Sequence, residues 1–283
     1  MVTPSRIRAL TEILRAGGIE DAELEAKWIA EDVPDDGQAR EIAGKRAEHF
    51  PLQYLLGTWE FYGMQFAVGE GVLIPRADTE TLVDAVLERY REYPGGRIAD
   101  LCAGSGCIAL ALASRLPRTK IFGVELSAKA REYAVRNAKT NGLSVPFYGA
   151  DVLDSATAKQ FRNLDVIVSN PPYLTAKDMA ALQTEVTYEP EMALDGGEDG
   201  LRFYREMTAR WKSSLRSGGM LAYEVGIHQA EPVAGILSAH GFTKIEQIPD
   251  LSGIARVVLG YLDADARKDY GTWQKQNSRK NPV

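Results

Sequence analysis

Asp100-Leu-Cys-Ala-Gly104-Ser-Gly106-Cys107 is the stretch of this sequence that decides the fold. It follows a short apolar run at 98–102 and precedes an apolar helical pattern at 108–116, so it predicts a strand, a glycine-rich turn and a helix. Glycines at 104 and 106 allow the backbone to turn sharply and to come close to a ligand. In a doubly wound sheet, ligands bind beyond the carboxyl ends of the strands, which is where this turn falls.

Strand and helix patterns alternate along the chain on both sides of this turn. We expect strands at 98–102, 120–124, 145–148, 165–169 and 220–225, and helices at 108–116, 128–141, 203–215 and 229–240. Segments 245–248 and 257–261 are separated by a loop too short for a crossover helix, which favours an antiparallel pair. The fold class is therefore α/β, with a doubly wound, mostly parallel Rossmann-like sheet that has an antiparallel last strand.

The amino-terminal region has a different pattern. Ile7, Leu10 and Leu14 lie at helical spacing, and further helical runs follow before Pro51. Aromatic and branched residues on both sides of Tyr62-Gly63 predict a short β-hairpin. We expect a helical domain over residues 1–50, a hairpin linker over 51–72, the main domain over 73–263 and a polar tail over 264–283.

Composition excludes several classes of protein. The net charge of −6 argues against a generic nucleic-acid binder, because neutralising phosphates requires a basic face. No apolar run approaches the roughly 20 residues that span a bilayer. The two cysteines, Cys102 and Cys107, do not form a disulfide framework, and no pair of histidines shows metal-ligand spacing. We expect a cytoplasmic monomer that contacts neither a membrane nor, directly, a nucleic acid, and that binds no metal.

A carboxylate at the end of the second strand completes a nucleotide-binding pattern. Glu125 lies 19 residues after Gly106, where an acidic side chain accepts hydrogen bonds from both hydroxyls of a ribose. Dinucleotide-binding folds use a similar loop, but Ala109 replaces the third glycine of their pattern, which disfavours NAD without excluding it. The two cysteines of the loop are interpreted as small packing residues.

The tetrapeptide Asn170-Pro-Pro-Tyr173 follows the fourth strand, so it lies at the same edge of the sheet. Its two prolines fix the backbone. The side-chain carbonyl of Asn170 and the backbone carbonyl of Pro171 then provide two fixed acceptors for a planar NH₂ group, and the ring of Tyr173 can pack on the flat face of an amide. Such acceptors orient a weakly nucleophilic amide nitrogen toward an electrophilic methyl group.

Together with the glycine-rich turn, this tetrapeptide resembles the amino-methyltransferases of the class I S-adenosylmethionine fold. That superfamily includes adenine-methylating DNA enzymes and protein glutamine methyltransferases. Further segments resemble the peptide chain release factor glutamine methyltransferase family, from about residue 51 to residue 261. They are Pro51-Leu-Gln-Tyr54, Gly57-Thr-Trp-Glu-Phe-Tyr-Gly63, Leu73-Ile-Pro-Arg76, Asp78-Thr-Glu80, Glu189-Pro190, Ala193-Leu194, Gly200-Leu201, Glu224-Val-Gly226 and Asp250-Leu-Ser-Gly253.

The resemblance implies S-adenosylmethionine as cofactor, S-adenosylhomocysteine as product, and the glutamine of the Gly-Gly-Gln loop of a release factor as substrate. The residues implied to surround the cofactor are Cys102, Ala103, Gly104, Ser105 and Gly106 at the methionine part, Glu125 at the ribose, Asp151 and Val152 at the adenine, and Asn170. Those implied to bind the substrate glutamine are Asn170, Pro171, Pro172 and Tyr173, of which Asn170, Pro171 and Tyr173 would be catalytic. The small helical domain would help to hold the protein substrate.

Segment 73–80 has two interpretations. The resemblance places it along the cofactor and substrate cleft, whereas local patterns read Asp78 as a helix N-cap and Arg76 as a surface charge. The sequence departs from the family at Ala77, where Pro is usual, and at Ala255, where Asp is usual. The helical region, which the resemblance implies would help to hold the protein substrate, is also short for the family.

Four alternatives remain open. A ribosomal-protein glutamine methyltransferase would use the same chemistry, although segment 76–80 favours the release-factor branch. The acidic charge counts against an adenine-N6 nucleic-acid methyltransferase. The incomplete glycine pattern and the absence of a convincing catalytic His or Lys count against a NAD-dependent dehydrogenase. A non-catalytic cofactor-binding protein would not need an intact Asn170.

Overall fold

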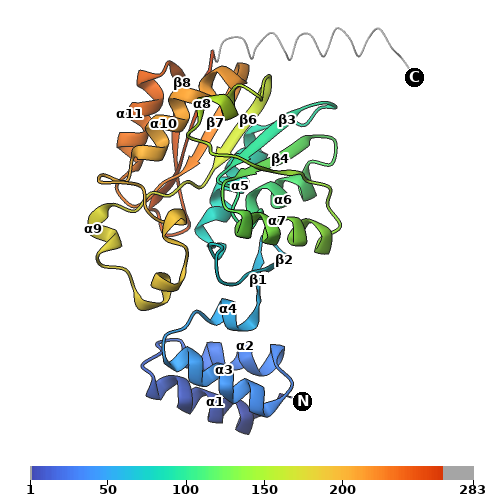
Figure 1. Cartoon of the computed structure of the whole chain (residues 1–283), viewed down its shortest axis with the longest axis vertical. Coiled ribbons are helices and arrows are strands. Elements are labelled where there is room, and N and C mark those ends of the chain that lie inside the picture. Colours follow the sequence, from blue (N-terminus) through green and yellow to red (C-terminus); the bar gives the residue numbers. More distant parts are fainter. Residues whose placement is uncertain (1, 264–283) are drawn as a thin grey trace.

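The structure is a computed structural model that describes residues 2–263, so the expected polar tail at 264–283 lies outside the described residues. A small group of helices lies at one end of the molecule, and a larger α/β part lies at the other (Figure 1). A β-hairpin runs between them. This arrangement places the first helices beside the edge of the main sheet that carries the expected site.

The amino-terminal helices pack around their own apolar cluster, which includes Leu10, Leu14 and Ile29. The elements are α1 (Pro4–Ala16), α2 (Ala22–Asp32), α3 (Asp36–Ala47) and the short α4 (Leu52–Leu56). Thr3 and Asp35 cap α1 and α3 with their side-chain oxygens. α3 ends at Ala47, and His49 shortly after it has a left-handed backbone (φ +65°). The residues after Pro51 form α4 before the hairpin begins.

The predicted hairpin is present as β1 (Thr58–Phe61) and β2 (Met64–Ala67). Tyr62 and Gly63 have φ values of +53° and +70°, the two left-handed positions that a two-residue type I′ turn requires. Phe61 and Phe66 are buried against each other and against the main apolar core, with ring centroids 6.0 Å apart. The hairpin is therefore fixed to the α/β part.

The main sheet has seven strands in the order β5-β4-β3-β6-β7-β9-β8. The strands are β3 (Arg97–Leu101), β4 (Lys120–Glu125), β5 (Phe147–Gly149), β6 (Leu164–Ser169), β7 (Leu215–Glu224), β8 (Phe242–Pro249) and β9 (Ala255–Leu262). All neighbours are parallel except β9, which is antiparallel to both β7 and β8. This confirms the predicted fold class.

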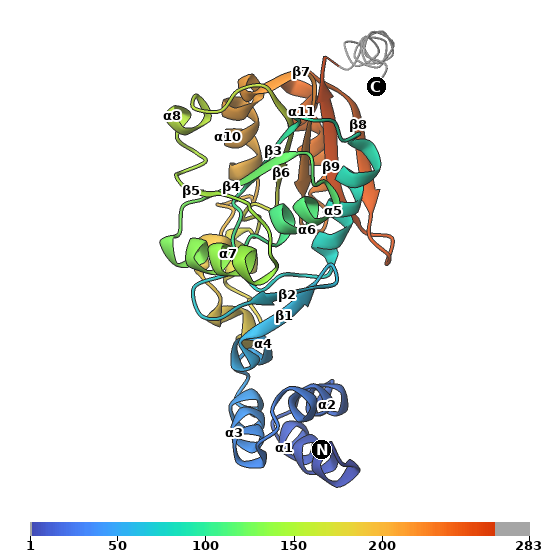
Figure 2. The same ribbon diagram turned by 90° about the vertical axis from the view of Figure 1, so that its right-hand side faces the viewer.

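Helices cover both faces of the sheet, as Figure 2 shows for α5 on one side and α10 on the other. They are α5 (Asp78–Arg89), α6 (Cys107–Arg115), α7 (Ala128–Thr140), α8 (Ser155–Ala158), α9 (Ala176–Met179), α10 (Arg202–Trp211) and α11 (Ala230–Ala239), with the 3₁₀ turns η1 (Thr184–Tyr188), η2 (Glu191–Ala193) and η3 (Lys212–Ser214). Successive strand residues alternate between two buried clusters: Val166 and Val168 pack with α5 and α6, and Ile167 packs with α10 and α11.

Several element boundaries differ from the expected ones, and two of the differences have a clear physical cause. The strand expected from residue 145 begins at Phe147, because Pro146 has no N–H to donate and takes part only through its carbonyl, which accepts from Gly123. The helix expected to reach residue 215 ends at Trp211, and β7 starts at Leu215. Trp211 is buried and donates its indole N–H to the Val152 carbonyl at 2.8 Å, which fixes the end of α10 against the segment that follows β5.

Candidate active site

The glycine-rich turn between β3 and α6 contains three residues with left-handed backbones. Cys102, Gly104 and Gly106 have φ values of +60°, +53° and +81°. A Cβ atom at Gly106 would lie 2.7 Å from the Phe147 ring, so this position needs glycine both for its backbone and for space. Asp100 of β3 connects the two ends of the turn, because its carboxylate accepts from the Ala109 N–H, in the first turn of α6, at 3.1 Å.

Glu125 holds the turn from the neighbouring strand. One carboxylate oxygen accepts from the Gly104 N–H at 2.9 Å and the other from the Ser127 N–H at 2.7 Å. Burial raises the pKa of Glu125, while these two backbone hydrogen bonds and Arg131 oppose the rise. The side chain is thereby fixed at the carboxyl end of β4, where the sequence predicted a ribose-binding carboxylate.

A cavity of about 490 Å³ lies beside the turn. Six of the expected cofactor residues line it: Cys102, Gly104, Glu125, Asp151, Val152 and Asn170. Ala103, Ser105 and Gly106 do not line it; they are buried behind the turn and shape its backbone. The other walls include segment 71–73 and the loop around η2, which the nucleotide-binding pattern did not predict.

A second cavity, of about 360 Å³, adjoins the first and shares Leu73, Asn170 and Ala193 with it. Tyr173, Arg76 and residues of the α9–η1 segment also line this second cavity. Pro172 faces the first cavity, whereas Pro171 is buried and lines neither. Asn170 therefore stands at the boundary between two spaces, one beside the nucleotide loop and one beside Tyr173.

The side chain of Asn170 is held by α5. Its Nδ2 donates to the hydroxyl oxygen of Thr79 at 3.3 Å, which leaves Oδ1 free of this contact. Tyr173 is held at the other end of the tetrapeptide, because Gln229 donates to its backbone carbonyl at 2.8 Å and accepts from the Gly226 N–H at 3.0 Å. Sequence reasoning assigned no role to Thr79 or Gln229, although Thr79 belongs to a segment that carries the family resemblance.

Glu224, at the end of β7, is a buried carboxylate beneath the tetrapeptide. The Tyr173 hydroxyl donates to Oε1 at 3.5 Å, and Oε2 is buried without a hydrogen-bond partner in the described part of the chain. Burial raises the pKa of Glu224 to about 7, although the nearby Thr79 hydroxyl and the charge of Arg256 act in the opposite direction. Burial next to this carboxylate also raises the pKa of Tyr173. Sequence reasoning used Glu224 only as part of the family resemblance.

The structure corrects the local interpretation of segment 73–80. Ala77, not Asp78, occupies the N-cap position of α5, and Asp78 pairs with Arg256 of β9 at 3.0 Å. Arg76 is not a free surface charge, because it pairs with the buried Glu189. Glu189 also accepts from the Ile74 N–H at 3.0 Å, so one carboxylate joins this segment to the loop before η2.

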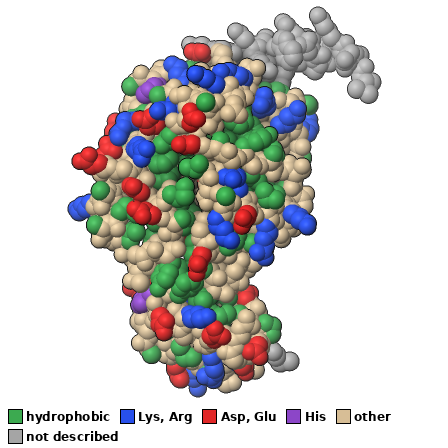
Figure 3. Space-filling view, in the orientation of Figure 1, with side chains coloured by type: hydrophobic (Ala, Val, Ile, Leu, Met, Phe, Trp, Pro, Cys, Tyr) green, Lys and Arg blue, Asp and Glu red, His purple; other side chains and the backbone are tan. Residues whose placement is uncertain are grey.

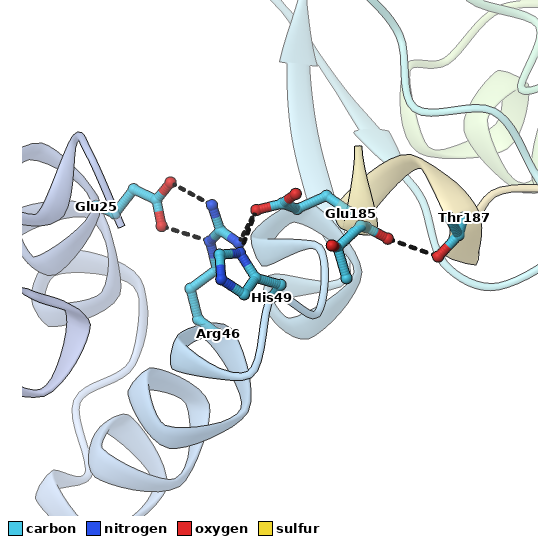
Figure 4. A network of polar contacts seen from close by, with 6 residues as sticks. Glu25, Arg46, His49, Glu185 and Thr187 are labelled. Atoms are coloured by element: carbon cyan, nitrogen blue, oxygen red, sulfur yellow. Dashed lines mark hydrogen bonds and ion pairs between the residues drawn. The ribbon is translucent and has the colours of Figure 1, made fainter. Parts of the chain in front are cut away.

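A third cavity, of about 680 Å³, lies between the amino-terminal helices and the loop that contains η1. Arg46 bridges it: Nε and Nη2 bind Glu25 of α2 at 2.7 and 3.1 Å, and Nη1 binds Glu185 of η1 at 2.9 Å (Figure 4). His49 Nδ1 lies 2.9 Å from the same Glu185 oxygen, so this histidine also joins the amino-terminal helices to η1. The rings of Phe50 and Tyr188 pack against each other, with their centroids 4.7 Å apart.

The loop from α9 to η2 contributes lining residues to all three cavities. Figure 3 shows apolar side chains in the narrow region between the helical end and the α/β part, with charged groups around them. Among residues 2–263, no helix is both long and apolar enough to cross a membrane. Within the same range, His, Cys, Asp and Glu side chains form no group of three or more that could hold a metal ion.

A glycine-rich turn, a carboxylate on the next strand and Asn170-Pro-Pro-Tyr173, all at one edge of this sheet, define a methyltransferase. A family model described as methyltransferase small domain matches residues 77–200. A solved methyltransferase structure from Pyrococcus furiosus has the same fold, with a TM-score of 0.52 and 16% identity, covering 71% of this chain and 90% of that one.

Relatives at higher identity define the particular family. The release factor glutamine methyltransferase of Geobacter sulfurreducens is 41% identical over 264 residues, covering 87% of this chain and 91% of the relative. That of Moorella thermoacetica is 38% identical over 278 residues, covering 90% and 97%. The chain belongs to the release factor glutamine methyltransferase family, which confirms the resemblance seen in the motifs.

Proposed function

We propose that this protein transfers the methyl group of S-adenosylmethionine to the side-chain amide nitrogen of a glutamine, in the Gly-Gly-Gln loop of a peptide chain release factor. The observation that carries the proposal is the position of Asn170 between two adjoining cavities. The cavity beside the glycine-rich turn would take the cofactor, and the cavity beside Tyr173 would take the glutamine. Donor and acceptor would then meet at Asn170.

The residues around the first cavity fit the proposed cofactor. Its volume, about 490 Å³, is in the range of pockets that enclose a small organic ligand. Glu125 is fixed by two backbone N–H groups and would accept the hydroxyls of the ribose. Asp151 and Val152 would frame the adenine, and Cys102 and Gly104 the methionine part. When bound, S-adenosylmethionine supplies an electrophilic methyl group.

The residues of the tetrapeptide would orient the nucleophile. An amide nitrogen is a weak nucleophile because its lone pair is delocalised into the carbonyl group. Asn170 Oδ1 would bind one of the two N–H groups and stabilise the positive charge that develops on nitrogen. The Pro171 carbonyl, expected from the sequence as the second acceptor, belongs to a residue that lines neither cavity. Tyr173 would pack against the plane of the amide. The proton can leave during or after transfer, so the site requires no strong base in advance.

The amino-terminal helices would help to hold the release factor. They are joined through Arg46 and His49 to η1, which belongs to the same loop as the wall of the second cavity. A protein bound between the helices and this loop would reach the second cavity with its Gly-Gly-Gln loop. Because release factors act in translation, we place the activity in the cytoplasm.

The test is methyl transfer from labelled S-adenosylmethionine to a purified release factor. We expect label on the wild-type factor and none when its Gly-Gly-Gln glutamine is changed to alanine. A ribosomal protein fraction and double-stranded DNA serve as competing acceptors. Strong labelling of either, with no labelling of the release factor, would rule the proposal out.

A further inference from the structure

We propose that Gln229 is a positioning residue for the methyl transfer, which fixes Tyr173 against the substrate amide from outside the second cavity. Gln229 lies in the turn between β7 and α11 and lines none of the three cavities described above. The inference rests on the proposed function, because it concerns how the same site holds the plane of its substrate amide.

Four hydrogen-bonding groups surround the side-chain amide of Gln229. Its Nε2 donates to the backbone carbonyls of Tyr173 and Gly200, at 2.8 and 3.4 Å. Its Oε1 accepts from the Gly226 N–H at 3.0 Å and from the Tyr204 hydroxyl at 3.5 Å. Because a backbone carbonyl can only accept and a backbone N–H can only donate, these partners allow one orientation of the amide.

The place of Gln229 in the chain suggests a simpler role, that of a helix cap. It occupies the N-cap position of α11, but its side chain makes no capping hydrogen bond to that helix. The amide turns back to Gly226, three residues earlier, and across to Tyr173, 56 positions away in the sequence. Its hydrogen bonds therefore connect the segments around the second cavity and do not stabilise the start of α11.

Gln229 holds Tyr173 from two sides. Its Nε2 binds the backbone carbonyl of Tyr173, and its Oε1 binds the N–H of Gly226. Gly226 in turn lies close to the Tyr173 ring, because a Cβ atom at Gly226 would be 3.0 Å from Cδ2 of that ring and 2.9 Å from Gln229 Oε1. One side chain therefore fixes both the backbone that carries the ring and the glycine beside the ring.

Gly200 connects Gln229 to the loop that walls the second cavity. This loop starts at Leu174, whose N–H donates to the Leu194 carbonyl at 2.9 Å, so its two ends are close together. A Cβ atom at Gly200 would lie 2.4 Å from the Tyr173 carbonyl oxygen, which is the atom that Gln229 binds. The tetrapeptide and the segment after the loop are thus held together at a single point.

The consequence for catalysis follows from the role of Tyr173 as the surface on which the substrate amide packs. The rate of a weak nucleophile depends on its orientation, and a displacement of about 1 Å can lower the rate on the order of 100-fold. Without Gln229, the ring would be free to shift relative to Asn170. Cofactor affinity depends on the first cavity, which neither Gln229 nor Tyr173 lines, so the loss should appear in kcat.

The experiment replaces Gln229 with glutamate, which keeps the shape of the side chain but puts an oxygen in place of the donor Nε2. That oxygen would face the carbonyls of Tyr173 and Gly200. We expect kcat for the release factor to fall roughly 10- to 100-fold, with the S-adenosylmethionine dissociation constant within about threefold of wild type. Gln160→Glu is the matched control, because Gln160 is exposed and should keep wild-type kcat.

Repeating Gln229→Glu in a Tyr173→Ala background separates a positioning role from a merely structural one. If Gln229 acts through Tyr173, its replacement should lower kcat by less than about threefold once the ring is absent. An equal loss in both backgrounds, or a normal kcat in the single variant, overturns the inference and leaves the proposed function standing. Absence of methyl transfer by the wild-type enzyme overturns both.

If Gln229→Glu does not fold, Gly226→Ala tests the same contacts from the other side. Its Cβ would press on the Tyr173 ring and on Gln229, so kcat should fall, and only when Tyr173 is present. Gly235→Ala in α11 is its control, because a Cβ there meets nothing within 4 Å and should leave kcat unchanged. A normal kcat in Gly226→Ala, or a loss of kcat that persists in the Tyr173→Ala background, overturns the inference.

Discussion

In the described part of the chain, the side chain of Asn170 makes one hydrogen bond, to Thr79 of α5, and Asn170 lines both cavities. The two prolines after it fix the backbone, so the position of this amide does not depend on a flexible loop. Of the residues that line both the proposed cofactor cavity and the proposed glutamine cavity, Asn170 has the polar side chain. At the scale of the residue, the proposed methyl transfer therefore depends most strongly on the position of the Asn170 side chain.

Changing Asn170 to alanine tests whether methyl transfer depends on this side chain. We expect kcat to fall by roughly 10²- to 10³-fold, because an oriented acceptor in the transition state is lost. The dissociation constant for S-adenosylmethionine should change by less than about threefold, since most of the first cavity remains. Single-turnover rates and cofactor titration measure the two quantities. Near-normal turnover would show that the side chain of Asn170 does not orient the nucleophile.

Glu224 predicts a dependence of stability on pH. Its pKa is about 7 in the folded protein, mainly because of burial, against an ordinary value of 4.5. The unfolded chain therefore releases this proton at lower pH than the folded protein does, and the folded state loses stability as pH rises from 4.5 to 7. Glu224→Gln removes the titration without removing the side chain.

We expect the stability of Glu224→Gln relative to wild type to increase by about 3 kcal/mol between pH 4.5 and pH 7, and to stay level above pH 7. Urea unfolding of both proteins across this range gives the difference, in which the other titrating groups cancel. A difference independent of pH would mean that Glu224 titrates normally in the folded protein.

At the scale of elements, Asn137 of α7 connects the hairpin to the glycine-rich turn. Its Oδ1 accepts from the Ala67 N–H at 2.7 Å, and its Nδ2 donates to the carbonyls of Ala67 and Ser105 at 3.2 and 3.0 Å. The side chain is fully buried, so water does not replace these bonds. One amide thus fixes β2 against the loop that would hold the cofactor.

Asn137→Ala should lower the free energy of unfolding by about 2–4 kcal/mol, because it leaves buried backbone groups of Ala67 and Ser105 unpaired. We also expect weaker S-adenosylmethionine binding, since Ser105 lies in the glycine-rich turn. Asn141→Ala is the matched control: it contacts the carbonyl of Gln65 on the same strand, at 2.9 Å, from a more exposed position. If the two variants destabilise equally, burial of Asn137 is not what fixes the hairpin.

Much of the element order could be predicted because its signals are local. Glycines at 104 and 106, the carboxylate at 125 and the prolines after Asn170 each mark the end of a strand in the sequence itself. The same signals did not identify Thr79, Glu224 or Gln229 as partners of the tetrapeptide. These residues meet it only when α5, β7 and the turn before α11 pack together, and nothing in their local sequence specifies that packing. For the same reason Arg76 was interpreted as a surface charge, because its partner Glu189 lies 113 positions away in the sequence.

At the scale of the whole molecule, Glu185 joins the amino-terminal helices to the loop that walls the second cavity. Arg46 and His49 both contact its Oε1 at 2.9 Å. Although its partial burial acts to raise the pKa of Glu185, hydrogen bonds from His49 and Arg46 lower it to about 2. The stability that these contacts add is therefore present above pH 4.5 and is lost only as pH falls toward 2. The connection persists throughout the neutral range.

Glu185→Gln should weaken this connection while leaving the proposed catalytic residues in place. Because the helices are proposed to hold the release factor, we expect KM for the intact factor to rise roughly three- to tenfold, which corresponds to about 0.7–1.4 kcal/mol. S-adenosylmethionine affinity and kcat at saturating factor should stay within about twofold of wild type. Initial rates over a range of release factor concentrations separate KM from kcat.

Glu198→Gln is the control for the lost charge, because Glu198 is an exposed acidic residue of the same loop region and should leave KM unchanged. A rise in KM for both variants would indicate a general effect of charge on association with the release factor. A fall in kcat for Glu185→Gln, with KM unchanged, would place the effect in the second cavity instead. Only a selective rise in KM supports the view that the position of the amino-terminal helices governs how the protein substrate is held.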